Sequence, residues 1–152
     1  MKPTIYLSGD HAGFELKNKI RYWLKKKGYE TRDFGPYVYN KDDDYPDFVI
    51  PMARSLLKCK NKDSRGVIVA GSGEGEAIAV NKLKGIRASV YHGKNLEIVK
   101  TTREHNDANV LCMGARFVSE NEMKKAIELF LKTKFQGGRH LRRINKYKSL
   151  GS

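Results

Sequence analysis

The segment from Gly66 to Asn81, GVIVAGSGEGEAIAVN, contains a glycine-rich turn between an apolar run and the start of an apolar helix. The turn interleaves three glycines with one serine and two glutamates: Gly71, Ser72, Gly73, Glu74, Gly75 and Glu76. Glycines at this density let backbone N–H groups approach a ligand closely, and a helix N-terminus adds positive potential. Two carboxylates in the turn would repel a phosphate dianion. The turn therefore suits a negative charge that develops during a reaction.

Other polar residues stand directly after predicted strands. Asp10 and His11 follow the apolar run 4–8, and Arg116 lies just beyond the run 110–113. The carboxyl ends of parallel strands lie along one edge of a sheet, and ligands bind in the crevice outside that edge. We therefore expect these residues to meet the glycine-rich turn in one crevice.

His105 and Asn106 precede the run 110–113, which assigns them to the amino end of that strand. They can reach the crevice if the helix 95–104 ends nearby, or if they come from a second subunit. The sequence leaves both possibilities open.

The elements that must position these residues alternate between strand and helix. Apolar and β-branched runs predict strands at 4–8, 29–34, 67–70, 85–91 and 110–113. Helical periodicity predicts helices at 16–27, 48–58, from 77, 95–104 and 121–134, with a basic segment of helical tendency at 141–148. This order predicts a single α/β domain over residues 1–152: a three-layer, Rossmann-like, doubly wound parallel sheet of five strands, with an extended basic helix at the C-terminus.

Composition narrows the classes of function. The 152 residues are enough for one domain with a substantial core, and the formal charge of +13 suits nucleic acid or phosphorylated metabolites. Aromatic and basic residues are not interleaved in a nucleic-acid motif, so nucleic-acid binding is not expected. No apolar run approaches the roughly 20 residues of a membrane span, and no signal peptide is evident, so we expect a cytoplasmic protein. Cys59 and Cys112 match no metal-ligand spacing, and we expect neither a metal nor a disulfide.

Five segments resemble the type B ribose-5-phosphate isomerases and the related galactose-6-phosphate isomerase subunits. They are SGDHAGFELK (8–17), DYPDF (44–48), GSGEGEAIAVNKLKGIRA (71–88), REHNDANVLCMGAR (103–116) and QGGRHLRRI (136–144). The similarity spans nearly the whole chain in the same order. It implies a metal-free and cofactor-free aldose–ketose isomerase that interconverts ribose 5-phosphate and ribulose 5-phosphate through a cis-enediolate, in the pentose phosphate pathway. It also implies a homodimer, or a dimer of dimers, with sites between subunits.

The resemblance suggests roles for the glycine-rich turn. Some members of the family use a cysteine before the first glycine as the base, but Ala70 occupies that position here. The other branch has a glutamate after the third glycine, which assigns the base to Glu76. The backbone N–H groups of 71–75 would form an oxyanion hole, with the Ser72 hydroxyl as a further donor. Glu74 departs from both branches and has no assigned role, and a purely structural alternative for Glu76 is stabilisation of the helix dipole.

The remaining matches concern the sugar and its phosphate. Residues at sugar-contacting positions of the family are Asp10, Tyr45, His105 and Asn106. Residues at its phosphate-binding positions are His11, Arg116, Arg139 and Arg143. By resemblance, His105 would take the proton of the anomeric hydroxyl and open the furanose ring. The tail from about residue 136 would reach the partner's site, so dimerisation would be required for activity.

Two alternatives stay open. One is an isomerase for another sugar phosphate of the same family, such as galactose 6-phosphate or allose 6-phosphate, because the sequence does not define the depth of the pocket. The other is a non-catalytic module that binds sugar phosphates or nucleic acid through the same fold. The presence of both Glu76 and His105 argues against this second alternative.

Overall fold

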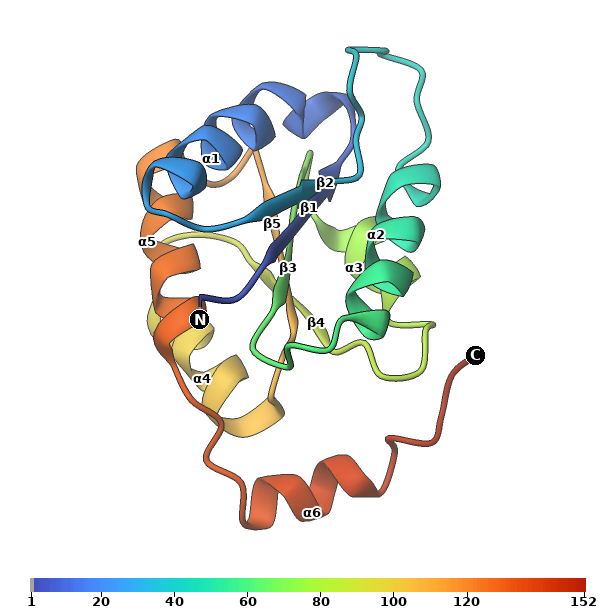
Figure 1. Cartoon of the computed structure of the whole chain (residues 1–152), viewed down its shortest axis with the longest axis vertical. Helices are drawn as coiled ribbons and strands as arrows, with labels where there is room; N and C mark the ends of the chain where they lie inside the picture. The colour runs from blue at the N-terminus through green and yellow to red at the C-terminus, as the bar shows by residue number, and fades with distance from the viewer. Residues whose placement is uncertain (1) are drawn as a thin grey trace.

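The computed structural model describes residues 2–152 and contains one parallel β-sheet (Figure 1). Its five strands are β1 (Ile5–Gly9), β2 (Thr31–Asp33), β3 (Arg65–Ala70), β4 (Ala88–Tyr91) and β5 (Val110–Gly114). The strand order is β2-β1-β3-β5-β4, with every neighbouring pair parallel. The direction of winding reverses between β1 and β3, where open α/β sheets form their ligand crevice. The predicted doubly wound fold is confirmed.

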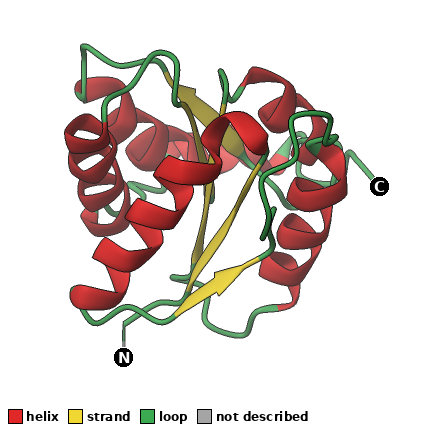
Figure 2. Cartoon of the chain, turned by 90° about the horizontal axis from the view of Figure 1, so that it is seen from above, coloured by secondary structure: helices red, strands yellow, loops and turns green. Residues whose placement is uncertain are grey.

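Helices cover both faces of the sheet (Figure 2). They are η1 (His11–Gly13), α1 (Phe14–Lys26), α2 (Pro46–Lys58), α3 (Glu74–Val80), α4 (Glu97–Asn106), α5 (Glu120–Lys132) and α6 (Arg139–Asn145). One face packs against α1, α4 and α5, and the other against α2 and α3. Helix α6 lies beyond the end of the sheet, next to the end of α4 (Figure 1).

Burial on both faces explains the unbroken apolar runs of the sequence. Successive side chains of a strand point to opposite faces, so Val67 and Val69 contact the α1, α4 and α5 layer. Ile68 and Ala70 point to α2 and α3. Every residue of β3 is buried, because a central parallel strand is covered from both sides.

Two strands are shorter than the sequence predicts. Strand β2 contains only Thr31–Asp33 of the predicted 29–34, and as an edge strand it is partly exposed. Strand β4 begins at Ala88 rather than residue 85, because Gly85 has a φ of +96° and belongs to the preceding turn.

The C-terminal tail also differs from the prediction. Helix α6 has seven residues, Arg139–Asn145, so the predicted extended helix over 141–148 is wrong in length and position. Gly137 and Gly138, with φ values of +70° and +56°, form the turn that starts it. The chain then returns to the body, where the Ser152 N–H donates to the Lys82 carbonyl at 3.0 Å. The tail therefore consists of the short helix α6 and a following segment, 146–152, that contacts the body of the protein again.

A buried ion pair connects α1 to the loop beside the crevice. The Lys17 side chain is fully buried, and its Nζ lies 2.8 and 2.7 Å from Oδ1 and Oδ2 of Asp33. Burial lowers the pKa of Lys17, and the Asp33 carboxylate opposes that shift. Asp33 also accepts from the Gly35 N–H at 2.9 Å, and the Gly35 carbonyl accepts from the Gly9 N–H at 3.1 Å. The pair therefore holds the loop that follows β2 against the end of β1.

We predict that Asp33→Asn lowers the free energy of unfolding by about 3 kcal/mol, because Lys17 would keep a buried charge without its counter-charge. Urea unfolding measures this loss. The matched control is Lys19→Gln, which breaks an exposed pair with Glu15 and should change stability by no more than about 0.5 kcal/mol. Equal losses in the two variants would contradict the prediction.

Candidate active site

Asp10 and His11 begin the crevice at the carboxyl end of β1. Asp10 is 8% exposed, and its Oδ1 accepts from the N–H groups of Ala12 at 2.9 Å and Gly13 at 3.3 Å. His11 donates its backbone N–H to Asp43 Oδ1 at 3.1 Å, and its Nδ1 lies 2.7 Å from the same oxygen. The hydrogen bond to Asp43 raises the pKa of His11. A carboxylate with a fixed orientation and a histidine that protonates readily therefore stand side by side.

The glycine-rich turn lies directly against this pair and against Arg116. A Cβ built on Gly71 would lie 3.5 Å from the Ala12 Cβ and 3.4 Å from the Arg116 Cζ. The Arg116 N–H donates to the Gly71 carbonyl at 3.2 Å. Arg116 and the segment that follows β1 thus lie beside the glycine-rich turn.

Two further glycines of the turn occupy positions that disfavour a side chain, Gly73 because of its backbone conformation and Gly75 because of a close neighbour. Gly73 precedes α3 with a φ of +86°, in the left-handed region that side chains rarely adopt. A Cβ on Gly75 would lie 2.7 Å from the Tyr45 hydroxyl oxygen. The tyrosine that precedes α2 thus lies against the first turn of α3, so the end of the loop 35–47 borders the glycine-rich turn.

Glu76 is the third residue of α3 and is only 4% exposed. Among residues 2–152, no cation lies within ion-pair distance of its carboxylate. Burial raises the pKa of Glu76, Asp10 and Glu74 raise it further, and a hydrogen bond with its own backbone N–H opposes them. A carboxylate in this state is a stronger base than a free glutamate.

Glu74 points to a different neighbour. Its Oε1 lies 2.7 Å from Nε2 of His92, which follows β4, and both side chains are about half exposed. The Glu74 N–H donates to the Ser72 hydroxyl oxygen at 3.2 Å, which holds the Ser72 side chain beside the first residue of α3. The structure therefore gives Glu74 a pairing partner that the sequence did not indicate.

His105 and Asn106 form the last turn of α4, at the opposite edge of the sheet. Strand β5, whose five residues span about 16 Å, separates this end from Arg116. The expectation that α4 could end near the crevice is wrong within one chain. The His105 ring instead stacks on His140 of α6, with ring centroids 4.2 Å apart.

Helix α6 brings Arg139 and Arg143 to the same edge as His105 (Figure 1). The thirteen predicted site residues therefore form two groups. At the carboxyl edge lie Asp10, His11, Tyr45, Gly71, Ser72, Gly73, Gly75, Glu76 and Arg116. At the amino edge lie His105, Asn106, Arg139 and Arg143.

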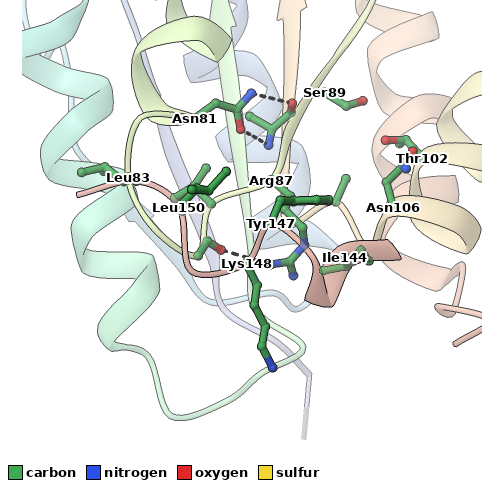
Figure 3. A pocket seen from close by; sticks show the side chains of 15 residues that line it. Asn81, Leu83, Arg87, Ser89, Thr102, Asn106, Ile144, Tyr147, Lys148 and Leu150 are labelled. Atoms are coloured by element: carbon green, nitrogen blue, oxygen red, sulfur yellow. Dashed lines mark hydrogen bonds between the residues drawn. The ribbon is translucent and has the colours of Figure 1, made fainter. Parts of the chain in front are cut away.

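A cavity of about 430 Å³ opens at the amino edge, between the tail and the loop before β4 (Figure 3). Ile144, Tyr147 and Leu150 of the tail face Arg87 across it, and Asn106 lies on its wall. Of the predicted site residues, only Asn106 lines this cavity, which is separate from the crevice beside Glu76.

A family profile described as Ribose/Galactose Isomerase matches residues 5–147. The chain belongs to the ribose/galactose isomerase family. A probable ribose-5-phosphate isomerase B of Mycoplasma genitalium is 40% identical over 146 residues, which cover 96% of this chain and 94% of the relative. The ribose-5-phosphate isomerase B of Mycolicibacterium paratuberculosis is 38% identical over 142 residues, covering 93% and 87%.

Solved structures of family members have the same fold. The ribose-5-phosphate isomerase B of Mycoplasma genitalium, with bound ribulose-5-phosphate, matches with a TM-score of 0.91 and 38% identity over 98% of this chain and 96% of that one. The Thermotoga maritima ribose 5-phosphate isomerase matches with a TM-score of 0.90 and 35% identity over 99% of this chain and 100% of that one.

The residues that the sequence did not single out are the partners of predicted site residues. Asp43 lies in an acidic run of the loop 35–47. Nothing in the sequence distinguishes it from the neighbouring Asp42 and Asp44 as the partner of His11. His92 lies just past β4 and pairs with Glu74 where α3 packs against β4. Within residues 2–152, no group of three or more His, Cys, Asp or Glu side chains is arranged to hold a metal. No helix in that range has the length and apolarity to cross a membrane.

The raised pKa of Glu76 predicts a pH-dependent stability difference. Above that pKa the folded protein holds an ionised, poorly solvated carboxylate, and protonation at lower pH removes this cost. Glu76→Gln stays neutral, so it should be more stable than the parent at about pH 7, and the difference should shrink on acidification through the Glu76 pKa. Urea unfolding at several pH values measures it, with exposed Glu30→Gln as control. A difference independent of pH would refute the prediction.

Proposed function

We propose that this chain isomerises ribose 5-phosphate to ribulose 5-phosphate and back, with Glu76 as the base. The main observation in support is the buried Glu76 carboxylate, with its raised pKa, beside the glycine-rich turn. Family membership supports the reaction class, and the Mycoplasma genitalium relative is described with bound ribulose-5-phosphate.

The reaction moves one proton between two carbons of the open-chain sugar. Glu76 removes the proton from C2 of the aldose, the electrons of that C–H bond form the C1–C2 double bond, and the carbonyl oxygen at C1 becomes the enediolate oxyanion. Protonated Glu76 then returns its proton to C1, the C2 oxygen re-forms a carbonyl as its hydroxyl proton is released, and that proton passes to the O1 oxyanion, which becomes the C1 hydroxyl of the ketose. The same carboxylate acts as base and acid, so it needs a pKa nearer to the working pH than that of a free glutamate.

The glycine-rich turn stabilises the enediolate. Backbone N–H groups of the turn 71–75, apart from that of Glu74, act with the Ser72 hydroxyl as donors toward the developing oxyanion. Asp10 orients sugar hydroxyls, and Tyr45, packed against Gly75, encloses that side. The enediolate carries its negative charge only during the reaction. The two carboxylates of the turn therefore do not repel a permanently charged phosphate group at this position.

The substrate phosphate binds away from Glu76. Arg116 and His11 supply positive charge at the carboxyl edge, and the hydrogen bond to Asp43 favours the charged form of His11 by raising its pKa. Arginine adds planar, paired hydrogen bonds to phosphate. The excess positive charge of the whole chain attracts such anionic substrates.

The functional unit is a homodimer in which the amino edge of one subunit meets the carboxyl edge of its partner. This arrangement is supported by the separation of about 16 Å between the two groups of predicted residues in one chain. Each site then takes Glu76 from one subunit, and His105, Asn106, Arg139 and Arg143 from the other. The tail from about residue 136 is the segment that reaches across, and His105 opens the ring of the bound sugar.

The base assignment is tested by Glu76→Gln, which should lower kcat for ribose 5-phosphate by about three orders of magnitude and leave KM nearly unchanged. Glu74→Gln is the matched control: it removes a carboxylate two residues away and should change kcat by less than about threefold, because it loses a half-exposed pair and the smallest of the contributions that raise the pKa of Glu76. Retention of most activity by Glu76→Gln would rule it out as the base. Parallel assays with galactose 6-phosphate test the six-carbon alternative, since the family description also names galactose.

Sharing of sites between subunits predicts complementation. Arg139→Gln and Glu76→Gln homodimers should each be impaired, whereas a mixed dimer would contain one site with both residues intact. Dissociating and reassociating equal amounts should therefore restore about a quarter of the parent activity, because half of the dimers are mixed and half of their sites are complete. Activity no higher than the mean of the two variants would assign each site to a single chain.

A further inference from the structure

Asp107 directly follows His105 and Asn106 and adopts a left-handed conformation, with φ +48° and ψ +43°. It ends α4, and its N–H donates to the Arg103 carbonyl at 3.2 Å. A side chain in this region of backbone space is disfavoured unless surrounding contacts hold it. Those contacts come from two arginines on different elements.

Arg87, in the loop before β4, binds both the backbone and the side chain of Asp107. Its Nε donates to the Asp107 carbonyl at 2.8 Å, and its Nη2 donates to Asp107 Oδ2 at 3.2 Å. Its Nη1 donates to the Gly85 carbonyl at 3.3 Å, which ties the guanidinium to its own loop.

Arg103, in α4, binds the other carboxylate oxygen of Asp107. Its Nη1 lies 2.9 Å from Asp107 Oδ1 and 2.6 Å from the Ala108 carbonyl. Its Nε donates to the Thr133 carbonyl at 3.2 Å, beyond the end of α5. Arg103 is only 3% exposed, so solvent screens these contacts weakly.

A third arginine, Arg65, lies near Arg103 and Asp107, so the negative charge of Asp107 offsets the repulsion between neighbouring guanidinium groups. Arg65 is 8% exposed, and its Nε is buried with no hydrogen-bond partner among the described residues. Burial and then the charge of Arg103 lower the pKa of Arg65 to about 10, while Asp107 opposes this shift. Asp107 is thus the shared counter-charge of neighbouring cations, and its carboxylate is held from two sides.

We propose that Arg87, Asp107 and Arg103 form a positioning clamp that orients His105 and Asn106 at the end of α4. Helix ends fray because their last carbonyls have no helical partners. The clamp fixes the residue that follows Asn106 to the β4 loop and to the segment after α5. His105 and Asn106 are thereby held in one orientation toward the partner's site. The proposal rests on the ring-opening role of His105 given above.

The chemistry of the two substrates separates a positioning role from a purely structural one. Ribose 5-phosphate exists in water mainly as a furanose and must be opened before isomerisation. Ribulose 5-phosphate has its O5 esterified, cannot close a five-membered ring, and is open-chain. The equilibrium constant fixes the ratio of kcat/KM in the two directions, so a misplaced His105 lowers kcat/KM for both sugars by the same factor. Exchange of a C1 proton of ribulose 5-phosphate with D2O needs only the base Glu76 and the enediolate, and it does not require the ring-opening step. Loss of folded protein would slow exchange and isomerisation alike.

The test measures isomerisation of ribose 5-phosphate and C1 proton exchange of ribulose 5-phosphate in D2O for Arg87→Gln and Asp107→Asn. Asparagine keeps the shape of the aspartate side chain and tolerates left-handed backbone, so this second variant protects against a failure of Arg87→Gln to fold. We expect kcat/KM for ribose 5-phosphate to fall about 10- to 100-fold, as for small misplacements of catalytic groups, with less than about a twofold change in the C1 exchange rate. Lys100→Gln, on the exposed side of α4, should change neither.

His105→Asn is measured in parallel as the reference. If it loses isomerisation but keeps C1 exchange and the clamp variants do not, the clamp proposal is overturned and the role of His105 stands. If His105→Asn slows C1 exchange as much as isomerisation, the ring-opening role fails and the proposal fails with it. Loss of isomerisation with retained exchange, in His105→Asn and in both clamp variants, supports the clamp.

Discussion

The desolvation of the Glu76 carboxylate is the constraint on which the rest of the site depends. A carboxylate in water is too weak a base to take a proton from carbon efficiently near neutral pH. Burial at the start of α3, without a neutralising cation among the described residues, raises its pKa. The surrounding groups must then provide donors for the enediolate without supplying a cation to Glu76 itself. Backbone N–H groups meet that requirement because they are dipoles rather than charges.

This requirement explains the arrangement of charge in the crevice. Arg116 contacts Gly71, at the beginning of the turn, whereas Glu76 lies past its end. Glu74, the one additional carboxylate of the turn, pairs with His92 beyond β4. In the proposed mechanism, the positive charge for the phosphate and the ionisable base therefore lie at opposite ends of the same short turn.

Ion pairs elsewhere stabilise the two edges of the sheet. At the carboxyl edge, the Lys17–Asp33 pair holds the loop beside Gly9, next to Asp10. At the amino edge, Arg87 and Arg103 hold Asp107. Both the Lys17–Asp33 pair and the arginines on Asp107 are hydrogen-bonded ion pairs. Such a pair fixes the orientation of its side chains, which apolar packing does not do. In the proposed dimeric site, each edge must be rigid, since the two edges meet only through the interface.

Much of the fold was determined by local sequence pattern. The five strands and their order with the helices follow from apolar runs and helical periodicity, and the glycines of the turn indicate backbone that approaches other atoms closely. The carboxyl-edge site followed as well, because Asp10, Arg116 and the glycine-rich turn each come directly after a strand, and parallel strands share an edge. The family resemblance supplied the roles of Glu76 and His105, which spacing alone could not.

Only the tertiary structure decided which residues meet. The separation of His105 from the crevice depends on the direction of β5 and on where α4 ends, and the stacking of His105 on His140 depends on the turn at Gly137 and Gly138. The sequence did not predict the pairing of His11 with Asp43 or of Glu74 with His92, because each contact joins segments far apart in the chain. Local propensity acts over a few residues, whereas the environment that raises the pKa of Glu76 is built by packing between α2, α3 and the sheet.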